Sequence, residues 1–324
     1  MKYSVLGSTG VKVSRICLGT ATFGVAPIAQ DADRLVGAAI DLGINFIDTA
    51  DVYGNLPVFD RPGAPAAADR EPAEQILGRA LRGRRDQLVL APKSNGIVGP
   101  DINDRGLSRR HIIRQVESSL RRLQTDYIDL YYAHDPDPDT PLEQTLAAYD
   151  DLIRQGKIRY VGLSNHPAWQ VTQALWIADD RRIQGPVAAQ VKYNLIDRAA
   201  ERELGPACQQ FGLSIVPYAP LHGGLLADLG VLDREVSGDQ RFGAAGFSDS
   251  EIAVAQGVDR LARVWGLAPY QVSRAWLLSR PAVASAIVGA ETSEELRANA
   301  TAADVELDRA QLDTLTALAT GLVP

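Results

Sequence analysis

The 324-residue sequence predicts an α/β protein, a single (β/α)8 TIM barrel that occupies residues 1–324 and carries an N-terminal β-hairpin and extra C-terminal helices. Two observations predict this fold. Short apolar runs alternate with helical periodicity eight times, and the composition does not change anywhere along the chain. A doubly wound sheet would alternate in the same way, and the length could also hold two domains, so periodicity by itself leaves both alternatives open.

The chain opens with a hairpin pattern. Apolar and polar residues alternate on both sides of Gly7–Gly10, a turn sequence rich in glycine. Short apolar runs bounded by turn residues then follow, as expected for the buried strands of a parallel sheet. The predicted strands cover residues 16–20, 46–48, 88–92, 127–132, 159–163, 187–191, 213–216 and 284–288.

Helical spacing of apolar residues fills the intervals between these strands. The helix ends carry typical signals, because Pro72 and Ser108 stand at starts while Gly43, Gly83 and Gly156 follow ends. The predicted helices cover residues 32–42, 72–82, 109–123, 141–155, 168–179, 200–211, 250–265, 269–279, 293–303 and 308–319.

Composition excludes several classes of partner. The net charge of −7 gives no basic surface for nucleic acid or for an anionic membrane, and we expect neither. No apolar leader opens the chain and no apolar run reaches the length of a membrane span, which predicts a cytoplasmic protein. Cys17 and Cys208 are too few for a disulfide framework or a zinc site with paired cysteines, so no metal is expected. We expect a monomer or a small homo-oligomer.

Four polar side chains stand near the ends of three successive predicted strands. Asp48 ends the second strand and Tyr53 follows it by five residues, while Lys93 and His134 end the next two. The carboxyl ends of parallel strands share one face, where α/β barrels keep their chemistry. Taken alone, each residue also has an ordinary structural interpretation, from a turn cap for the aspartate to a solvated strand end for the lysine.

Together the four side chains form a proton donor. Asp48 beside Lys93 keeps the ammonium charged, and the ammonium favours the phenolate of Tyr53, which lowers the pKa of that tyrosine. A histidine at the same point can hydrogen-bond a substrate carbonyl oxygen. The combination predicts a tyrosine that donates a proton to a carbonyl near neutral pH. No G-x-G-x-x-G fingerprint follows any strand, so a Rossmann dinucleotide site is not expected.

A series of motifs resembles the aldo-keto reductases. Leu6–Ser14 and Leu18–Gly24 look like the start of that family, and Asp48–Gly54, Ser119–Leu130 and Gly156–Asn165 match its later signatures. The resemblance covers nearly the whole chain. It implies a (β/α)8 barrel and an extended NAD(P)H cofactor that lies across the carboxyl face without a glycine fingerprint. It implies a catalytic tetrad of Asp48, Tyr53, Lys93 and His134.

The resemblance also implies how the cofactor is held. Ser164, Asn165 and Gln190 correspond to the groups that hydrogen-bond the nicotinamide carboxamide, and Tyr218 corresponds to the ring that stacks on it. Ordinary alternatives for these residues are a strand-end turn and a core aromatic. Residues 219–224 correspond to the segment around the pyrophosphate, and residues 289–299 to the adenosine end. The implied cofactor-binding residues are Thr20, Ser164, Asn165, Gln190, Tyr218, Pro220, Leu221, Gly223, Arg241, Gly289, Glu291, Glu295 and Asn299.

The adenosine end departs from the family pattern. Glu291 stands where arginine is frequent, Ala298 where glutamate is frequent and Leu229 where lysine is frequent, although Arg241 can still supply a cation. A carboxylate close to a phosphate dianion costs roughly 1–4 kcal/mol at about 4 Å, whereas it can accept a hydrogen bond from a free ribose hydroxyl. These charges favour NADH or dual use, against the NADPH preference that the resemblance implies.

The resemblance predicts an NAD(P)H-dependent enzyme that reduces an aldehyde, ketone or sugar to an alcohol, with the hydride from nicotinamide and the proton from Tyr53. Two alternatives remain open. One is a nicotinamide-binding regulatory subunit with little turnover, like the β subunits of potassium channels, which share this barrel. The other is an aldose dehydrogenase that works in the oxidative direction. An isomerase or lyase on an ordinary barrel would predict no nicotinamide binding at all.

The long loop Asn55–Arg70 directly follows the proposed acid and contains several prolines. Loops of this length are uncommon unless they are functional or disordered. Leu56, Val58 and Phe59 offer apolar surface, and we expect the loop to line the substrate pocket. A surface excursion without function is the alternative.

Overall fold

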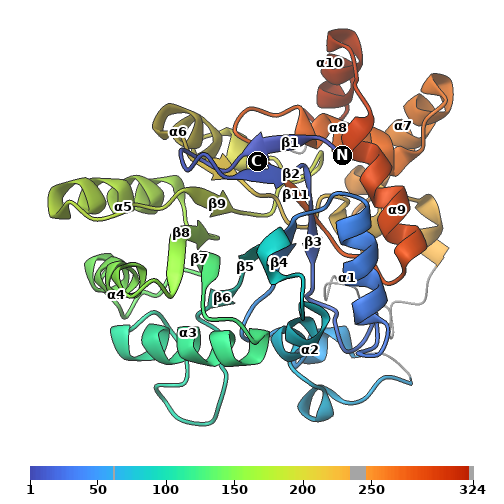
Figure 1. Cartoon of the computed structure of the whole chain (residues 1–324). Coiled ribbons are helices and arrows are strands. Elements are labelled where there is room, and N and C mark those ends of the chain that lie inside the picture. Colours follow the sequence, from blue (N-terminus) through green and yellow to red (C-terminus); the bar gives the residue numbers. More distant parts are fainter. Residues whose placement is uncertain (61–62, 234–245, 321–324) are drawn as a thin grey trace.

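The computed structural model of the chain describes residues 1–60, 63–233 and 246–320. Within these ranges short parallel strands form a central ring, and α-helices surround it (Figure 1). The predicted strands are confirmed, and the third is followed directly by a two-residue strand that was not predicted separately. The strands of the ring are β3 (Ile16–Gly19), β4 (Phe46–Asp48), β5 (Val89–Ala91), β6 (Lys93–Ser94), β7 (Ile128–Ala133), β8 (Ile158–Ser164), β9 (Ala188–Gln190), β10 (Ser214–Ile215) and β11 (Ala286–Val288).

Backbone hydrogen bonds assemble these strands into a barrel. Two parallel sheets have the orders β11-β3-β4-β5 and β10-β9-β8-β7-β6. The strand predicted at residues 88–92 ends at Ala91 as β5, because the nitrogen of Pro92 has no hydrogen to donate to a neighbouring strand, and the two-residue strand β6 follows Pro92. Hydrogen bonds also join β10 of one sheet to the residues that precede β11 of the other. The Ile215 N–H donates to the Ala282 carbonyl over 2.7 Å and the Ala284 N–H donates to the Ile215 carbonyl over 2.9 Å. These contacts join the two sheets, as the predicted barrel requires.

The predicted hairpin pairs β1 (Tyr3–Val5) with β2 (Lys12–Ser14) in antiparallel register. In Figure 1 it lies across the barrel strands. The Gly7 N–H donates to the Ser214 hydroxyl over 2.7 Å, which ties the hairpin turn to β10. A Cβ on Gly7 would lie 2.4 Å from the Val187 carbonyl oxygen, and the residue has φ +52°, so this close approach requires glycine.

An apolar cluster fills the amino end of the barrel beneath this hairpin. Leu6 and Val13 from the hairpin region pack with Cys17, Phe46 and Val216, whose side chains come from the barrel strands and their immediate continuations. All five side chains are buried. Burial of this kind is the main favourable contribution to folding, so the hairpin acts as a plug at the end of the barrel opposite the predicted site.

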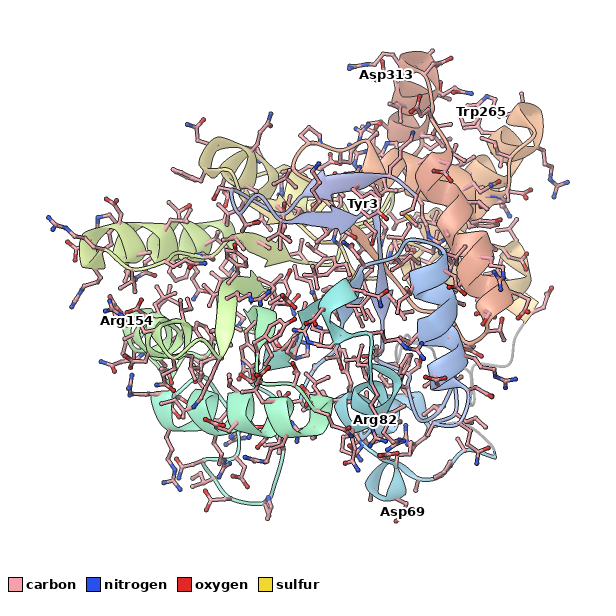
Figure 2. All side chains as sticks on the ribbon, in the orientation of Figure 1. Tyr3, Asp69, Arg82, Arg154, Trp265 and Asp313 are labelled. Carbon is pink, nitrogen blue, oxygen red and sulfur yellow. The ribbon has the colours of Figure 1, made fainter. Side chains whose placement is uncertain are left out.

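The helices follow the predicted intervals with small shifts at their ends. Side chains fill the space between them and the strands, and the labelled Arg154 and Asp313 lie at the periphery (Figure 2). No helix in the described ranges is long and apolar enough to cross a membrane. The helices are α1 (Ala32–Asp41), α2 (Ala73–Ala80), α3 (Arg109–Leu123), α4 (Leu142–Arg154), α5 (Ala168–Arg181), α6 (Leu204–Phe211), α7 (Asp249–Trp265), α8 (Pro269–Leu278), α9 (Ser293–Thr301) and α10 (Arg309–Leu318).

Helix α3 illustrates how the sequence specifies these elements. The Ser108 hydroxyl accepts a hydrogen bond from the His111 N–H over 3.3 Å and caps the first turn. Ile112, Val116 and Leu123 recur at helical spacing and are fully buried against the barrel. The apolar face therefore fixes which side of the helix meets the strands.

The described part of the long loop Asn55–Arg70, which leaves out residues 61 and 62, contains the short 3-10 turns Pro57–Phe59 and Ala67–Asp69. The Asn55 side-chain amide donates to the Ala67 carbonyl over 3.0 Å and to the Arg70 carbonyl over 2.7 Å. The start of the loop is therefore bonded to its end. This arrangement holds the loop beside the turn that contains the predicted acid.

Candidate active site

The structure brings the four predicted catalytic residues together at the carboxyl ends of three neighbouring strands. Asp48 is the last residue of β4, His134 directly follows β7, and Lys93 follows the carboxyl end of β5 as the first residue of the two-residue strand β6. Tyr53 lies in the turn after β4, where its N–H donates to the Ala50 carbonyl over 3.2 Å. Parallel strands in register carry their ends to one face, so residues far apart in sequence converge.

Lys93 is the centre of this cluster. Its ammonium nitrogen lies 2.6 Å from Asp48 Oδ1, 2.9 Å from the Thr49 carbonyl oxygen and 3.1 Å from the Tyr53 hydroxyl oxygen. An ammonium has three hydrogens, and each has an acceptor here. Since the Tyr53 oxygen accepts from Lys93, its own hydrogen stays available to another acceptor.

Two further residues hold the carboxylate in place. The Gln190 side-chain amide donates to Asp48 Oδ2 over 2.8 Å. The Thr20 N–H and hydroxyl donate to the Asp48 carbonyl oxygen over 3.0 and 2.9 Å. Thr20 is fully buried and does not line the cavity described below. Its polar groups are therefore used to fix β3 against β4, and the structure does not bring it to the expected cofactor site.

Burial changes the expected acidity of Tyr53. Desolvation raises the pKa of Tyr53 above its ordinary value, and the nearby Lys93 ammonium opposes this only in part. The expectation of a net lowering is wrong, because it counted the neighbouring charge and not the loss of water. Burial lowers the pKa of Lys93, but Asp48 and Tyr53 together outweigh it and the net direction is upward. Tyr53 is therefore protonated, and Lys93 charged, at neutral pH.

His134 faces Tyr53 edge-on, with ring centroids 5.8 Å apart and an angle of 80° between the rings. Burial, with a smaller contribution from Lys93, lowers the pKa of His134 to about 3. The imidazole is therefore neutral at physiological pH. A neutral imidazole carries one N–H donor and one acceptor, so it suits a hydrogen bond to a carbonyl oxygen.

A single cavity of about 490 Å³ contains this face. Lys93 lies behind its wall, while the other three tetrad residues line it. Leu229 lies in the 3-10 turn Leu229–Asp233 and does not line the cavity. Arg241 lies outside the described residues. The predicted cofactor residues on the wall are Ser164, Asn165, Gln190, Tyr218, Pro220, Leu221, Gly223, Gly289, Glu291, Glu295 and Asn299.

The residues predicted for the nicotinamide differ in how they are bonded. Asn165 donates to Asp135 Oδ1 over 2.8 Å, and its own Oδ1 accepts from the Tyr218 hydroxyl over 3.0 Å. The Ser164 hydroxyl is buried and has no hydrogen-bond partner in the described part of the chain. Buried polar atoms are nearly always paired, so Ser164 has bonding capacity for a ligand in the cavity.

The segment predicted for the pyrophosphate is held by a histidine. His222 Nδ1 lies 2.6 Å from Asp197 Oδ2, and His222 Nε2 lies 2.8 Å from Glu251 Oε1. Glu251 lies in the first turn of α7. The next residue, Gly223, has φ +66° and lines the cavity. His222 therefore links this part of the wall to the loop after β9 and to α7.

The far part of the wall is built by α8, α9 and the residues before α9. The Asn299 side-chain amide donates to the Gly289 carbonyl over 3.3 Å. The Glu291 N–H donates to Glu295 Oε2 over 3.0 Å, and the Thr292 hydroxyl caps α9. The carboxylate of Glu295 is therefore bonded within this wall.

The loop residue Phe59 lines the cavity, as expected, whereas Val58 is 41% exposed and does not. Sequence reasoning missed two large polar residues of the wall. Tyr270 and Arg274 come from α8 and were not predicted. A sequence signal for Arg274 was present, because it is the one charged residue in the otherwise largely apolar run 272–278; that the whole run is buried is known only from the structure.

The sequence comparisons decide the family. A family profile described as "Aldo/keto reductase family" matches residues 15–320. The chain belongs to the aldo/keto reductase family. It is an oxidoreductase, and this family acts on small carbonyl compounds and generally uses NAD(P)H.

Several relatives in the aldo/keto reductase family align along almost their full length. An "Uncharacterized oxidoreductase YrpG" of Bacillus subtilis (strain 168) is 38% identical over 95% of this chain and 93% of its own. A "Probable voltage-gated potassium channel subunit beta" of Oryza sativa subsp. japonica is 34% identical over 94% of this chain and 92% of its own. The "Aldo-keto reductase YhdN" of B. subtilis (strain 168) is 32% identical over 92% of this chain and 87% of its own.

In residues 1–60, 63–233 and 246–320, no group of three His, Cys, Asp or Glu side chains could hold a metal ion.

Proposed function

We propose that this aldo/keto reductase reduces the carbonyl group of an aldehyde, ketone or sugar, with NAD(P)H as cofactor and Tyr53 as the proton donor. One observation carries the proposal. The Tyr53 oxygen accepts a hydrogen bond from Lys93 Nζ over 3.1 Å, while Tyr53 itself lines the cavity. Its own hydroxyl hydrogen is therefore the group that a carbonyl oxygen in the cavity can accept.

The extent of the cavity supports an extended dinucleotide as its ligand. Its wall runs from the tetrad, past the glycine pair Gly223–Gly224, to α9. The unpartnered Ser164 hydroxyl and the Tyr218 ring support a nicotinamide beside Tyr53. When bound there, reduced nicotinamide would supply a hydride to the carbonyl carbon. NADH and NADPH both fit this description of the site.

The residues of the chain supply the rest of the reaction. The neutral His134 orients the carbonyl oxygen by donating its N–H. Tyr53 gives up its proton to that oxygen, and the adjacent Lys93 ammonium stabilises the phenolate that forms. Asp48 holds Lys93 by the bond of 2.6 Å, so it acts as a positioning residue. The exclusion of water by the buried cluster strengthens each of these interactions.

Tyr53→Phe tests the assignment. It removes the proton donor and keeps the ring, so we expect kcat to fall by roughly 10²–10⁴, with the dinucleotide Kd unchanged. Tyr127→Phe is the matched control, because its hydroxyl bonds to Asp86, and neither residue lines the cavity. Near-normal carbonyl reduction by Tyr53→Phe would refute the role of Tyr53 as the acid.

A second candidate is a nicotinamide-binding regulatory subunit. It rests on the relatives named as probable potassium channel β subunits, 34% and 33% identical to this chain. The two candidates differ in turnover. Steady cofactor oxidation with a panel of aldehydes and keto-sugars supports the enzyme, while tight dinucleotide binding without turnover supports the subunit. Cofactor reduction in the presence of an aldose would identify the oxidative direction instead.

A further inference from the structure

Arg274 is a buried cation in the wall of the cavity. It lies on α8, its residue exposure is 3%, and it lines the same cavity as Tyr53. Its Nε has no hydrogen-bond partner among the described residues. Its Nη1 lies 3.5 Å from the Asn299 carbonyl oxygen, which is long for a hydrogen bond, and its Cζ lies 5.7 Å from the centre of the Tyr270 ring.

The other buried arginines of the described chain are bonded differently. Arg70 forms an ion pair with Asp60. Arg198 forms a two-pronged pair with Glu201, at 3.0 Å from Nε and 2.7 Å from Nη2. Arg274, the least exposed of the three, has no carboxylate partner in the ranges that the structure describes. A buried charge without a partner is strongly unfavourable, so the guanidinium has bonding capacity for an anionic group of a ligand in the cavity.

The position of Arg274 indicates which part of a ligand it meets. The tetrad occupies the wall built by β4, β6 and β7, whereas Arg274 contacts Asn299 of α9 in the wall built by α8 and α9. If the nicotinamide lies beside Tyr53, as proposed above, the other half of the dinucleotide is the part that reaches α8 and α9. That half is adenosine, and it carries a 2′-phosphate in NADPH and a 2′-hydroxyl in NADH.

We propose that Arg274 binds the 2′-phosphate of NADPH and makes this enzyme select the phosphorylated cofactor; the inference rests on the proposed function. A guanidinium fork matches the oxygens of a phosphate and supplies two or more charge-assisted hydrogen bonds. A neutral ribose hydroxyl would leave the cation uncompensated. The expectation of NADH or dual use counted Glu291 and Leu229 but not a cation that enters the cavity from α8.

Calorimetric titration of wild type and Arg274→Met with NADPH, NADH, 2′,5′-ADP and ADP tests the proposal. We expect wild type to bind NADPH at least about 10-fold more tightly than NADH. In Arg274→Met the Kd for NADPH and 2′,5′-ADP should rise by about 10- to 100-fold, the size of a charge-assisted contact, and the Kd for NADH should change less than twofold. Arg274→Lys keeps the charge without the fork and should recover part of the loss.

Arg280→Met is the matched control, because Arg280 follows the same helix but does not line the cavity, and its binding constants should equal those of wild type. Thermal unfolding without ligand separates a binding role from a structural one. Removal of an unpaired buried charge should leave Tm unchanged or raise it, whereas loss of a structural arginine would lower it.

Each contrary outcome identifies what has failed. Equal weakening of NADPH and NADH, or of 2′,5′-ADP and ADP, would assign Arg274 to a group that both cofactors share and overturn the proposal. So would a lower Tm with unchanged cofactor selectivity. Failure of wild type to bind either dinucleotide would overturn the proposed function together with this inference, while binding without selectivity would overturn the inference alone.

Discussion

The two ends of the cavity handle charge in opposite ways. At the tetrad, the Lys93 ammonium has three acceptors, and both carboxylate oxygens of Asp48 have donors. At the wall formed by α8 and α9, the buried Arg274 has no carboxylate partner in the described chain. The charges at the tetrad compensate each other without a ligand, whereas the proposed partner of the Arg274 charge is the phosphate of a bound cofactor. Changes at the tetrad should therefore affect stability and rate, and changes at Arg274 should affect affinity and selectivity.

The largest expected effect comes from removal of the ammonium that pairs with Asp48 at the tetrad. Lys93→Met leaves Asp48 buried without its countercharge, and we expect the free energy of unfolding to fall by about 3–5 kcal/mol. Urea unfolding measures it. Lys157→Met is the control, since Lys157 pairs with Glu117 on the partly exposed surface, where such pairs contribute at most about 1 kcal/mol. Equal losses of unfolding free energy in the two variants would mean that the Lys93–Asp48 pair contributes no more to stability than a surface ion pair.

A second prediction uses pH to probe the same end. The pKa of His134 is about 3 in the folded protein and about 6.5 in an unfolded chain. Below pH 6.5 the unfolded state binds a proton that the folded state excludes, so stability falls as the pH falls toward 3. The slope from this group approaches about 1.4 kcal/mol per pH unit. His134→Asn should lose that slope in urea titrations between pH 6.5 and 4.5, and parallel curves for variant and wild type would contradict the shift.

A third prediction concerns the long loop Asn55–Arg70, which contributes Phe59 to the cavity wall. Phe59 lines the cavity, so Phe59→Ala should raise KM for hydrophobic aldehydes by about 10-fold, the size of a lost apolar contact in a binding pocket. The dinucleotide Kd should stay constant. Val58→Ala is the control, because Val58 is 41% exposed and does not line the cavity. Unchanged KM across a substrate panel would show that the loop Asn55–Arg70 does not contribute to substrate binding.

The smallest expected effect comes from a change at His222, in the part of the cavity wall between the tetrad and α9. Glu251→Gln keeps a side chain that can still cap α7 but removes one of the two carboxylates beside His222. We expect a loss of about 1 kcal/mol or less in unfolding free energy, with faster amide hydrogen exchange in residues 221–226. Exchange rates equal to those of wild type would show that Asp197 alone holds this segment.

Local sequence patterns were sufficient for the strands, the helices and the convergence of Asp48, Tyr53, Lys93 and His134 on one face. Apolar runs and helix caps are local signals, and the carboxyl ends of parallel strands meet wherever the strands are in register. Three features required the three-dimensional structure. The pKa of Tyr53 depends on burial, the use of Thr20 depends on the pairing of β3 with β4, and the role of Arg274 depends on which side of α8 faces the cavity. Each is a property of the packed molecule rather than of a motif.

The hairpin that plugs the amino end has a kinetic consequence. Because Leu6 and Val13 seal that end with the inner strand residues, the carbonyl compound and the dinucleotide approach Tyr53 from the same side. The carbonyl compound would then bind on top of a dinucleotide that lies along the wall from the tetrad to α9. Turnover should then be sequential, with the dinucleotide first to enter and last to leave, and the oxidised dinucleotide should compete with the reduced one.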